Sequence, residues 1–226
     1  MAPSTSPGSS LPEEAALSRY ALADLERFYR IHARIYDWTR PFLLFGRREG
    51  ARSVEVGPGD LALDVGCGTG FNLPLLAAAG ASVVGIECAP AMRARAEARL
   101  RRIPKAVRER VLLDARPYGS HDAYAGRASS ILFSYSLSMI PPFDEVLARA
   151  RADLAPGGRV AVVDFLDAPP PMAAALRASH VFLGSDRLRM LERLFPAHRV
   201  SIRTVGLWRY FVFLGGSSGR RRRTRA

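Results

Sequence analysis

Short apolar runs alternate with helical patterns through the middle of the chain. Five of the runs are continuous and apolar, which is typical of strands buried on both faces. They lie at residues 61–65, 82–86, 111–113, 131–135 and 159–165. Apolar residues recur at helical spacing between them, at 73–79, 90–102 and 145–154, with Asp144 as the expected N-cap of the last helix. This alternation predicts a doubly wound α/β fold around a mostly parallel sheet.

The pattern changes after the three prolines at 169–171. Two helical segments, 172–183 and 185–195, precede two strands at 199–205 and 207–214. Gly206 separates these strands, so the pattern predicts a terminal antiparallel hairpin and a sheet of seven strands.

The domain boundaries follow from composition. Residues 1–12 are rich in Pro, Ser and Gly and are expected to be disordered, and the basic tail 216–226 likewise. Residues 13–215 form one domain, in which 13–58 is an N-terminal helical segment that we expect to act as a lid. No second domain or internal repeat is visible.

The formal net charge is +12, and Lys105 is the only lysine, so the excess is arginine. Five arginines lie in the tail, at 220–223 and 225. Such a charge favours an anionic partner, either nucleic acid or an anionic membrane face. The chain shows neither a signal peptide nor an apolar run long enough to span a bilayer, so we expect a cytoplasmic protein. Two unpaired cysteines without a histidine cluster predict no metal site.

A glycine-rich turn follows the first strand. Asp64 ends that strand, and Gly66, Gly68 and Gly70 follow it, with Cys67 inside the turn. Glycine lets the backbone approach a ligand closely and opens the next helix N-terminus toward it. The dinucleotide fingerprint needs another glycine where Phe71 stands, which disfavours NAD. The turn therefore predicts a nucleoside cofactor without a phosphate, S-adenosyl-L-methionine.

Acidic residues also end the next two strands. Glu87 can accept both ribose hydroxyls, as its counterpart does in dinucleotide folds. Asp114 can take the adenine amino group, with the backbone N–H of Ala115 serving a ring nitrogen. Cys88 after Glu87 and Ser134 at the end of the fourth strand complete the candidate cofactor residues.

Several segments resemble the bacterial diacylglyceryl-homoserine N-methyltransferases, which make betaine lipids and belong to the class I S-adenosylmethionine-dependent methyltransferases. The similar segments are Tyr29–Arg40, Leu44–Arg47, Ser134–Pro141, Val162–Phe165 and Gly206–Phe211, within residues 25–215. The Tyr-Ser-Leu-Ser-Met-Ile and Trp-Arg-Tyr-Phe runs are specific, whereas the glycine motif is generic. The family's basic run after the fifth strand is displaced here, so phosphatidylethanolamine and soluble small molecules stay open as acceptors.

The resemblance implies up to three methyl transfers to the amine of a homoserine-type lipid headgroup. Tyr29, Tyr36 and Tyr135 are then candidates to line the transfer chamber, because aromatic faces attract a methylated ammonium. His180 is a candidate proton acceptor, and Arg47, Arg189 and Arg209 are candidates to hold the substrate carboxylate. A lipid substrate implies peripheral association with the inner membrane face, with the homoserine-lipid-forming enzyme as a functional partner. A nucleic-acid partner is not expected.

Overall fold

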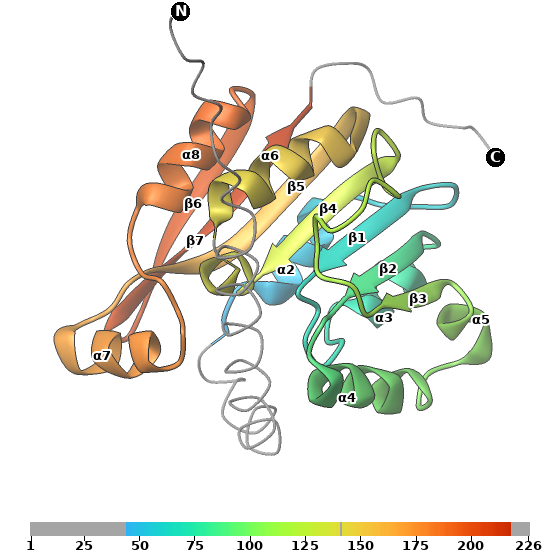
Figure 1. Ribbon diagram of the computed structural model, residues 1–226, viewed down its shortest axis with the longest axis horizontal. Coiled ribbons are helices and arrows are strands. Elements are labelled where there is room, and N and C mark those ends of the chain that lie inside the picture. The colour runs from blue at the N-terminus through green and yellow to red at the C-terminus, as the bar shows by residue number, and fades with distance from the viewer. Residues whose placement is uncertain (1–43, 141, 218–226) are drawn as a thin grey trace, which may run out of the picture.

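Seven strands form one sheet in the computed structural model, which describes residues 44–140 and 142–217 (Figure 1). The sheet order is β3-β2-β1-β4-β5-β7-β6. Strands β1 to β5 pair in parallel, and β7 runs antiparallel to both β5 and β6. This confirms the predicted fold class. The strands are β1 (Leu61–Val65), β2 (Ser82–Ile86), β3 (Val111–Asp114), β4 (Ala128–Ser134), β5 (Leu154–Asp167), β6 (His198–Val205) and β7 (Trp208–Gly216).

Helices cover both faces of the sheet (Figure 1). Leu63 and Val65 of β1 pack in one apolar cluster with α6 and α8, whereas Ala62 packs in another with α2, α3 and α4. Each apolar run thus contributes side chains to two apolar cores, one on each face of the sheet, because neighbouring side chains of a strand point to opposite faces. The helices are α2 (Arg47–Ser53), α3 (Leu73–Ala78), α4 (Pro90–Leu100), α5 (Lys105–Arg108), the 3-10 turn η2 (Leu137–Met139), α6 (Phe143–Asp153), α7 (Pro170–Ala178) and α8 (Asp186–Leu194).

Some predicted boundaries were wrong. Helix α6 begins at Phe143 with Pro142 at the N-cap, so Asp144 lies in the first turn and does not cap it. Helix α7 ends at Ala178, five residues before its predicted end. Gly216 is still the last residue of β7, so the tail begins later than residue 216.

Helix α2 belongs to the layer that covers the sheet. A Cβ on Gly50 would lie 2.4 Å from the Val163 side chain, so only glycine allows this close approach. Helix α2, within the predicted lid segment, therefore packs closely on the sheet, and the lid role of residues 13–58 stays a prediction. Residues 13–43 of that prediction lie outside the described residues.

Candidate functional site

The three glycines after β1 differ in what surrounds them. A Cβ on Gly66 would lie 2.5 Å from Cβ of Ser136, and one on Gly70 would lie 3.0 Å from Cβ of Ala96. A Cβ on Gly68, whose φ is +57°, would meet no atom within 4 Å. Gly66 and Gly70 therefore allow close packing, whereas Gly68 borders open space. The binding of a nucleoside at this turn stays a prediction.

Glu87 closes the turn from the side of β2. Its two carboxylate oxygens accept the backbone N–H groups of Gly68 and Ala89, each at 2.9 Å. Burial raises the pKa of Glu87, which these two N–H donors oppose. Each oxygen keeps a lone pair for a ribose hydroxyl, so the geometry is consistent with the predicted role. Next to it, the Cys88 carbonyl accepts from Arg93 Nη1 at 3.4 Å.

Asp64 at the end of β1 is fully buried, and neither carboxylate oxygen has a hydrogen-bond partner of good geometry among residues 44–140 and 142–217. Burial raises its pKa to about 7, the Asn72 amide and the Arg47 charge lower it, and Glu87 raises it further. A buried carboxylate beside a nucleoside turn suits a cationic ligand. S-adenosylmethionine carries a sulfonium and an ammonium, so the residues present fit this cofactor. The nearby Cys67 thiol is buried, which raises its pKa.

The backbone is strained where β4 ends. Tyr135 has φ +58°, which costs a bulky residue about 1–3 kcal/mol. Its N–H donates to the Val163 carbonyl at 2.7 Å, its hydroxyl donates to the Phe45 carbonyl at 2.8 Å, and its ring packs edge-on to Phe165. Such strain clusters at functional sites. The predicted residue Ser134 precedes it, with a buried Oγ for which residues 44–140 and 142–217 supply no partner.

Ser136 joins this segment to the glycine turn, a contact that the sequence reasoning missed. Its hydroxyl donates to the Val65 carbonyl at 2.6 Å, and its Cβ packs against Gly66. The strained Tyr135 is therefore the chain neighbour of Ser136, which contacts the cofactor turn. The serine-rich run 134–138 indicated in the sequence that a serine could contact β1, but the run alone does not identify which serine does so.

A buried ion pair braces the turn η2. Asp164 Oδ2 accepts the Ser138 N–H at 2.7 Å and lies 3.9 Å from Nε of Arg187, and Arg187 also donates to the Phe165 carbonyl. Both charged side chains are almost fully buried. This pair was also missed, because an arginine in an amphipathic helix is ordinarily exposed.

Of the three candidate arginines, only Arg47 is linked to these groups. Its guanidinium lies 4.1 Å from the centre of the Phe71 ring, and its charge lowers the pKa of both Asp64 and Tyr135. Arg189 pairs with Asp186, and Arg209 pairs with Asp167, both at exposed positions.

His180 has a backbone role. Its φ is +58°, its N–H donates to the Arg177 carbonyl, and the Val181 N–H donates to the Leu176 carbonyl. These are the two hydrogen bonds of a Schellman C-cap, so His180 ends α7 with its side chain exposed. This placement does not support proton transfer by His180, which stays a prediction. Tyr29 and Tyr36 lie outside the described residues.

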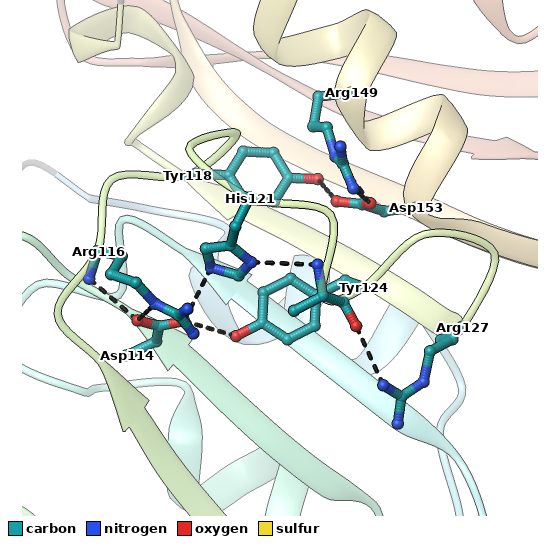
Figure 2. Close-up of polar contacts among 9 residues, drawn as sticks. Asp114, Arg116, Tyr118, His121, Tyr124, Arg127, Arg149 and Asp153 are labelled. Carbon is teal, nitrogen blue, oxygen red and sulfur yellow. Dashed lines mark hydrogen bonds and ion pairs between the residues drawn. The ribbon is translucent and has the colours of Figure 1, made fainter.

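Asp114 at the end of β3 is surrounded by donors from the loop that follows it (Figure 2). Arg116, Tyr124 and His121 all contact its carboxylate, and Arg116 holds the pKa of that group well below its usual range. The adenine role of Asp114 and of the exposed Ala115 stays a prediction, and Asp114 already has other partners.

The family model and the curated relatives that match this chain by sequence are methyltransferases. The model of a family described as "Methyltransferase domain" matches residues 29–213. Demethylmenaquinone methyltransferase of Tropheryma whipplei is 31% identical over 148 residues, which are 63% of this chain and 59% of that protein. The match thus covers less than two thirds of the length of these curated relatives.

Solved structures show the same fold. A Burkholderia thailandensis 1,6-didemethyltoxoflavin N1-methyltransferase with S-adenosylhomocysteine has a TM-score of 0.62 at 19% identity, covering 96% of this chain and 94% of that one. A Haemonchus contortus phosphoethanolamine N-methyltransferase 2 complex has a TM-score of 0.66 at 13% identity, covering 78% and 53%. The matched family model, the glycine turn and the sheet order agree. The chain therefore belongs to the methyltransferase domain family, in its class I branch that uses S-adenosylmethionine as cofactor.

Proposed function

We propose that the protein transfers methyl groups to the amine of a diacylglyceryl-homoserine-type lipid headgroup. One observation carries the proposal: a buried aromatic cluster, called the wall below, adjoins the segment that packs on the cofactor turn. Tyr135 and Phe165, at the carboxyl ends of β4 and β5, are buried in one apolar cluster with Met139 and with Tyr210 of β7, which pairs with Phe165. Tyr135 adjoins Ser136, which packs on Gly66. The identity of the headgroup in this proposal is inferred from the sequence resemblance to diacylglyceryl-homoserine N-methyltransferases.

The wall suits the charge that develops during the reaction. When bound, the cofactor supplies an electrophilic methyl group on a sulfonium. The substrate nitrogen must first lose a proton, because only its lone pair can form the new N–C bond. Positive charge then grows on that nitrogen, and aromatic faces stabilise it. Burial raises the pKa of Tyr135 above its usual range, so the ring stays neutral and its hydroxyl is not the base.

Arg47 is the candidate partner for the substrate carboxylate. Its charge reaches both Asp64 on the cofactor side and Tyr135 on the wall. A guanidinium in that position can bind a carboxylate with two hydrogen bonds. A homoserine headgroup carries a carboxylate next to its amine, whereas phosphatidylethanolamine does not.

Membrane access is part of the same proposal. The structure holds no helix in the described residues that is long and apolar enough to cross a bilayer. Leu207, at the β6–β7 turn, is 79% exposed and precedes Trp208, which packs against the aromatic cluster. Together with the net charge of +12, this exposed side chain supports peripheral association with an anionic membrane. The enzyme that forms the homoserine lipid is the functional partner this activity requires.

The test supplies the full chain with methyl-labelled cofactor and three acceptors in mixed micelles: the homoserine lipid, phosphatidylethanolamine and demethylmenaquinone. Labelled betaine lipid, detected by mass spectrometry, is the expected product. Labelling of only another acceptor would refute the proposal. Demethylmenaquinone is included because the curated relative of that name favours transfer to a quinone ring as the second candidate.

Two variants sharpen the assay. Tyr135→Phe keeps the ring and should retain most activity, whereas Tyr135→Leu removes the π-face and should lower kcat about tenfold, a loss of about 1 kcal/mol or slightly more. Arg47→Gln should raise KM for the homoserine lipid, with S-adenosylhomocysteine affinity unchanged. Should that affinity fall instead, Arg47 binds the carboxylate of the cofactor and not that of the lipid.

A further inference from the structure

The short turn η2 is hydrogen-bonded to two other segments. Asp164 Oδ2 of β5 accepts the Ser138 N–H at 2.7 Å. The Ser138 carbonyl in turn accepts the Phe182 N–H at 2.9 Å, from the connection between α7 and α8. That connection also donates the Gly184 N–H to the Leu166 carbonyl of β5 at 2.9 Å. The turn η2, the end of β5 and the α7–α8 connection therefore form one hydrogen-bonded unit.

Arg187 joins this unit from the first turn of α8. Its Nη2 donates to the Phe165 carbonyl at 3.0 Å, its Nε lies 3.9 Å from Asp164 Oδ2, and its guanidinium carbon lies 5.8 Å from the centre of the Phe143 ring. The Asp164 and Arg187 side chains are 0% and 2% exposed. Burial raises the pKa of Asp164, and the Arg187 charge opposes that rise. Each charge depends on the other, because a buried charge without a partner is costly.

The pair adjoins the aromatic wall. Tyr135 lies two residues before η2, and Met139 is the last residue of η2; both are buried in one cluster with Phe165. The Phe165 N–H donates to Asp164 Oδ1 at 2.8 Å, and its carbonyl accepts from Arg187, so both members of the pair hold its backbone. The glycine turn is held instead by the carboxylate that follows β2.

We infer that Asp164 and Arg187 are positioning residues for the methyl acceptor, which fix η2, Phe165 and the α7–α8 connection in the arrangement that orients the acceptor nitrogen. Charge-assisted hydrogen bonds suit this task because they are strong and directional. Orientation acts on the chemical step, where a displacement of about 1 Å can lower the rate about a hundredfold. The inference rests on the wall of the proposed function and not on the identity of the acceptor.

Arg187→Lys in the full chain is the first test, because it keeps the positive charge but loses the planar fork that reaches both partners. We expect kcat to fall about tenfold and amides at 137–139 and 179–185 to exchange hydrogen faster, with S-adenosylhomocysteine affinity in calorimetry within about threefold of the original. Turnover is measured with whichever of the homoserine lipid, phosphatidylethanolamine and demethylmenaquinone the unaltered protein labels. Arg193→Lys, the same change at an exposed position of α8, is the control and should alter none of these values. Unchanged kcat or unchanged exchange in Arg187→Lys would overturn the inference.

A double variant separates positioning from stability. Asp164→Asn combined with Arg187→Met removes both buried charges, so it should melt at a higher temperature than Arg187→Met alone. Its kcat should stay low, because the Ser138 N–H and the Phe165 carbonyl have lost their charged partners. Recovery of full turnover together with stability would show that the pair is only structural and would overturn the inference.

The cofactor affinity supplies the last distinction. A loss of S-adenosylhomocysteine affinity as large as the loss of turnover would place the action of the pair on the cofactor turn and would also overturn the inference. Labelling of only phosphatidylethanolamine or demethylmenaquinone would refute the proposed function, and the kcat of the variants on that acceptor would still decide the role of the pair.

Discussion

Replacing Asp64 by Asn should stabilise the ligand-free protein and weaken cofactor binding. The carboxyl group is fully buried, and its pKa is raised from 3.8 to about 7 by burial. Folding therefore favours the protonated acid, and that contribution is complete below pH 3.8 and lost as pH rises through about 7. A rise of this size makes the anion costlier in the fold by on the order of 4 kcal/mol, at about 1.4 kcal/mol for each pH unit. Asparagine has the shape of the neutral acid and does not titrate.

Urea unfolding across a pH series measures this difference. The two proteins should have similar free energies of unfolding near pH 4, and the variant should be more stable by up to about 4 kcal/mol at pH 8. S-adenosylmethionine affinity should fall, because the neutral amide no longer faces a cation. Asp144→Asn, the same change at an exposed position in α6, is the matched control and should follow the original curve. Parallel stability curves for Asp64→Asn and the unaltered protein would show that the carboxylate is solvated or paired, and the reasoning would be wrong.

Three further outcomes are expected. Glu87→Gln leaves one of the N–H groups at Gly68 and Ala89 without an acceptor and should weaken S-adenosylhomocysteine binding by about 1–3 kcal/mol in calorimetry, whereas Glu97→Gln on the exposed face of α4 should not. Alanine is strained at both Gly68 and Gly66, whose φ angles are +57° and +66°, but only the Cβ at Gly66 would also clash, with Ser136. Gly66→Ala should therefore unfold at a lower temperature than Gly68→Ala, whereas Gly68→Ala should lose cofactor affinity because its Cβ enters the open space. Equal melting temperatures of the two variants would contradict this contrast. Deleting residues 218–226 removes five arginines, each contributing about 1 kcal/mol near an anionic leaflet, and should reduce vesicle sedimentation at low salt only.

The sequence determined the sheet and the start of the site. Strands β1 and β2 end where their apolar runs end, at Val65 and Ile86, because a buried run stops where the chain must turn. Parallel strands place their carboxyl ends at one edge, so Asp64, Glu87 and the glycine turn had to converge. A glycine run followed by Phe71 was also enough to favour S-adenosylmethionine over a dinucleotide. These conclusions depend on local pattern and on the few arrangements that a βα repeat allows.

Tertiary structure decided what each side chain does within that frame. His180 is a candidate proton acceptor from the sequence, yet its conformation is set by the hydrogen bonds that end α7. Ser136 is one of several serines, and only the packing of β4 against β1 selects it. Asp114 ends β3 as the sequence predicts, and only the folded loop brings Tyr124 and His121 to its carboxylate. Which donors reach an acceptor depends on the path of a loop of irregular structure, and hydrophobic periodicity carries no information about that path.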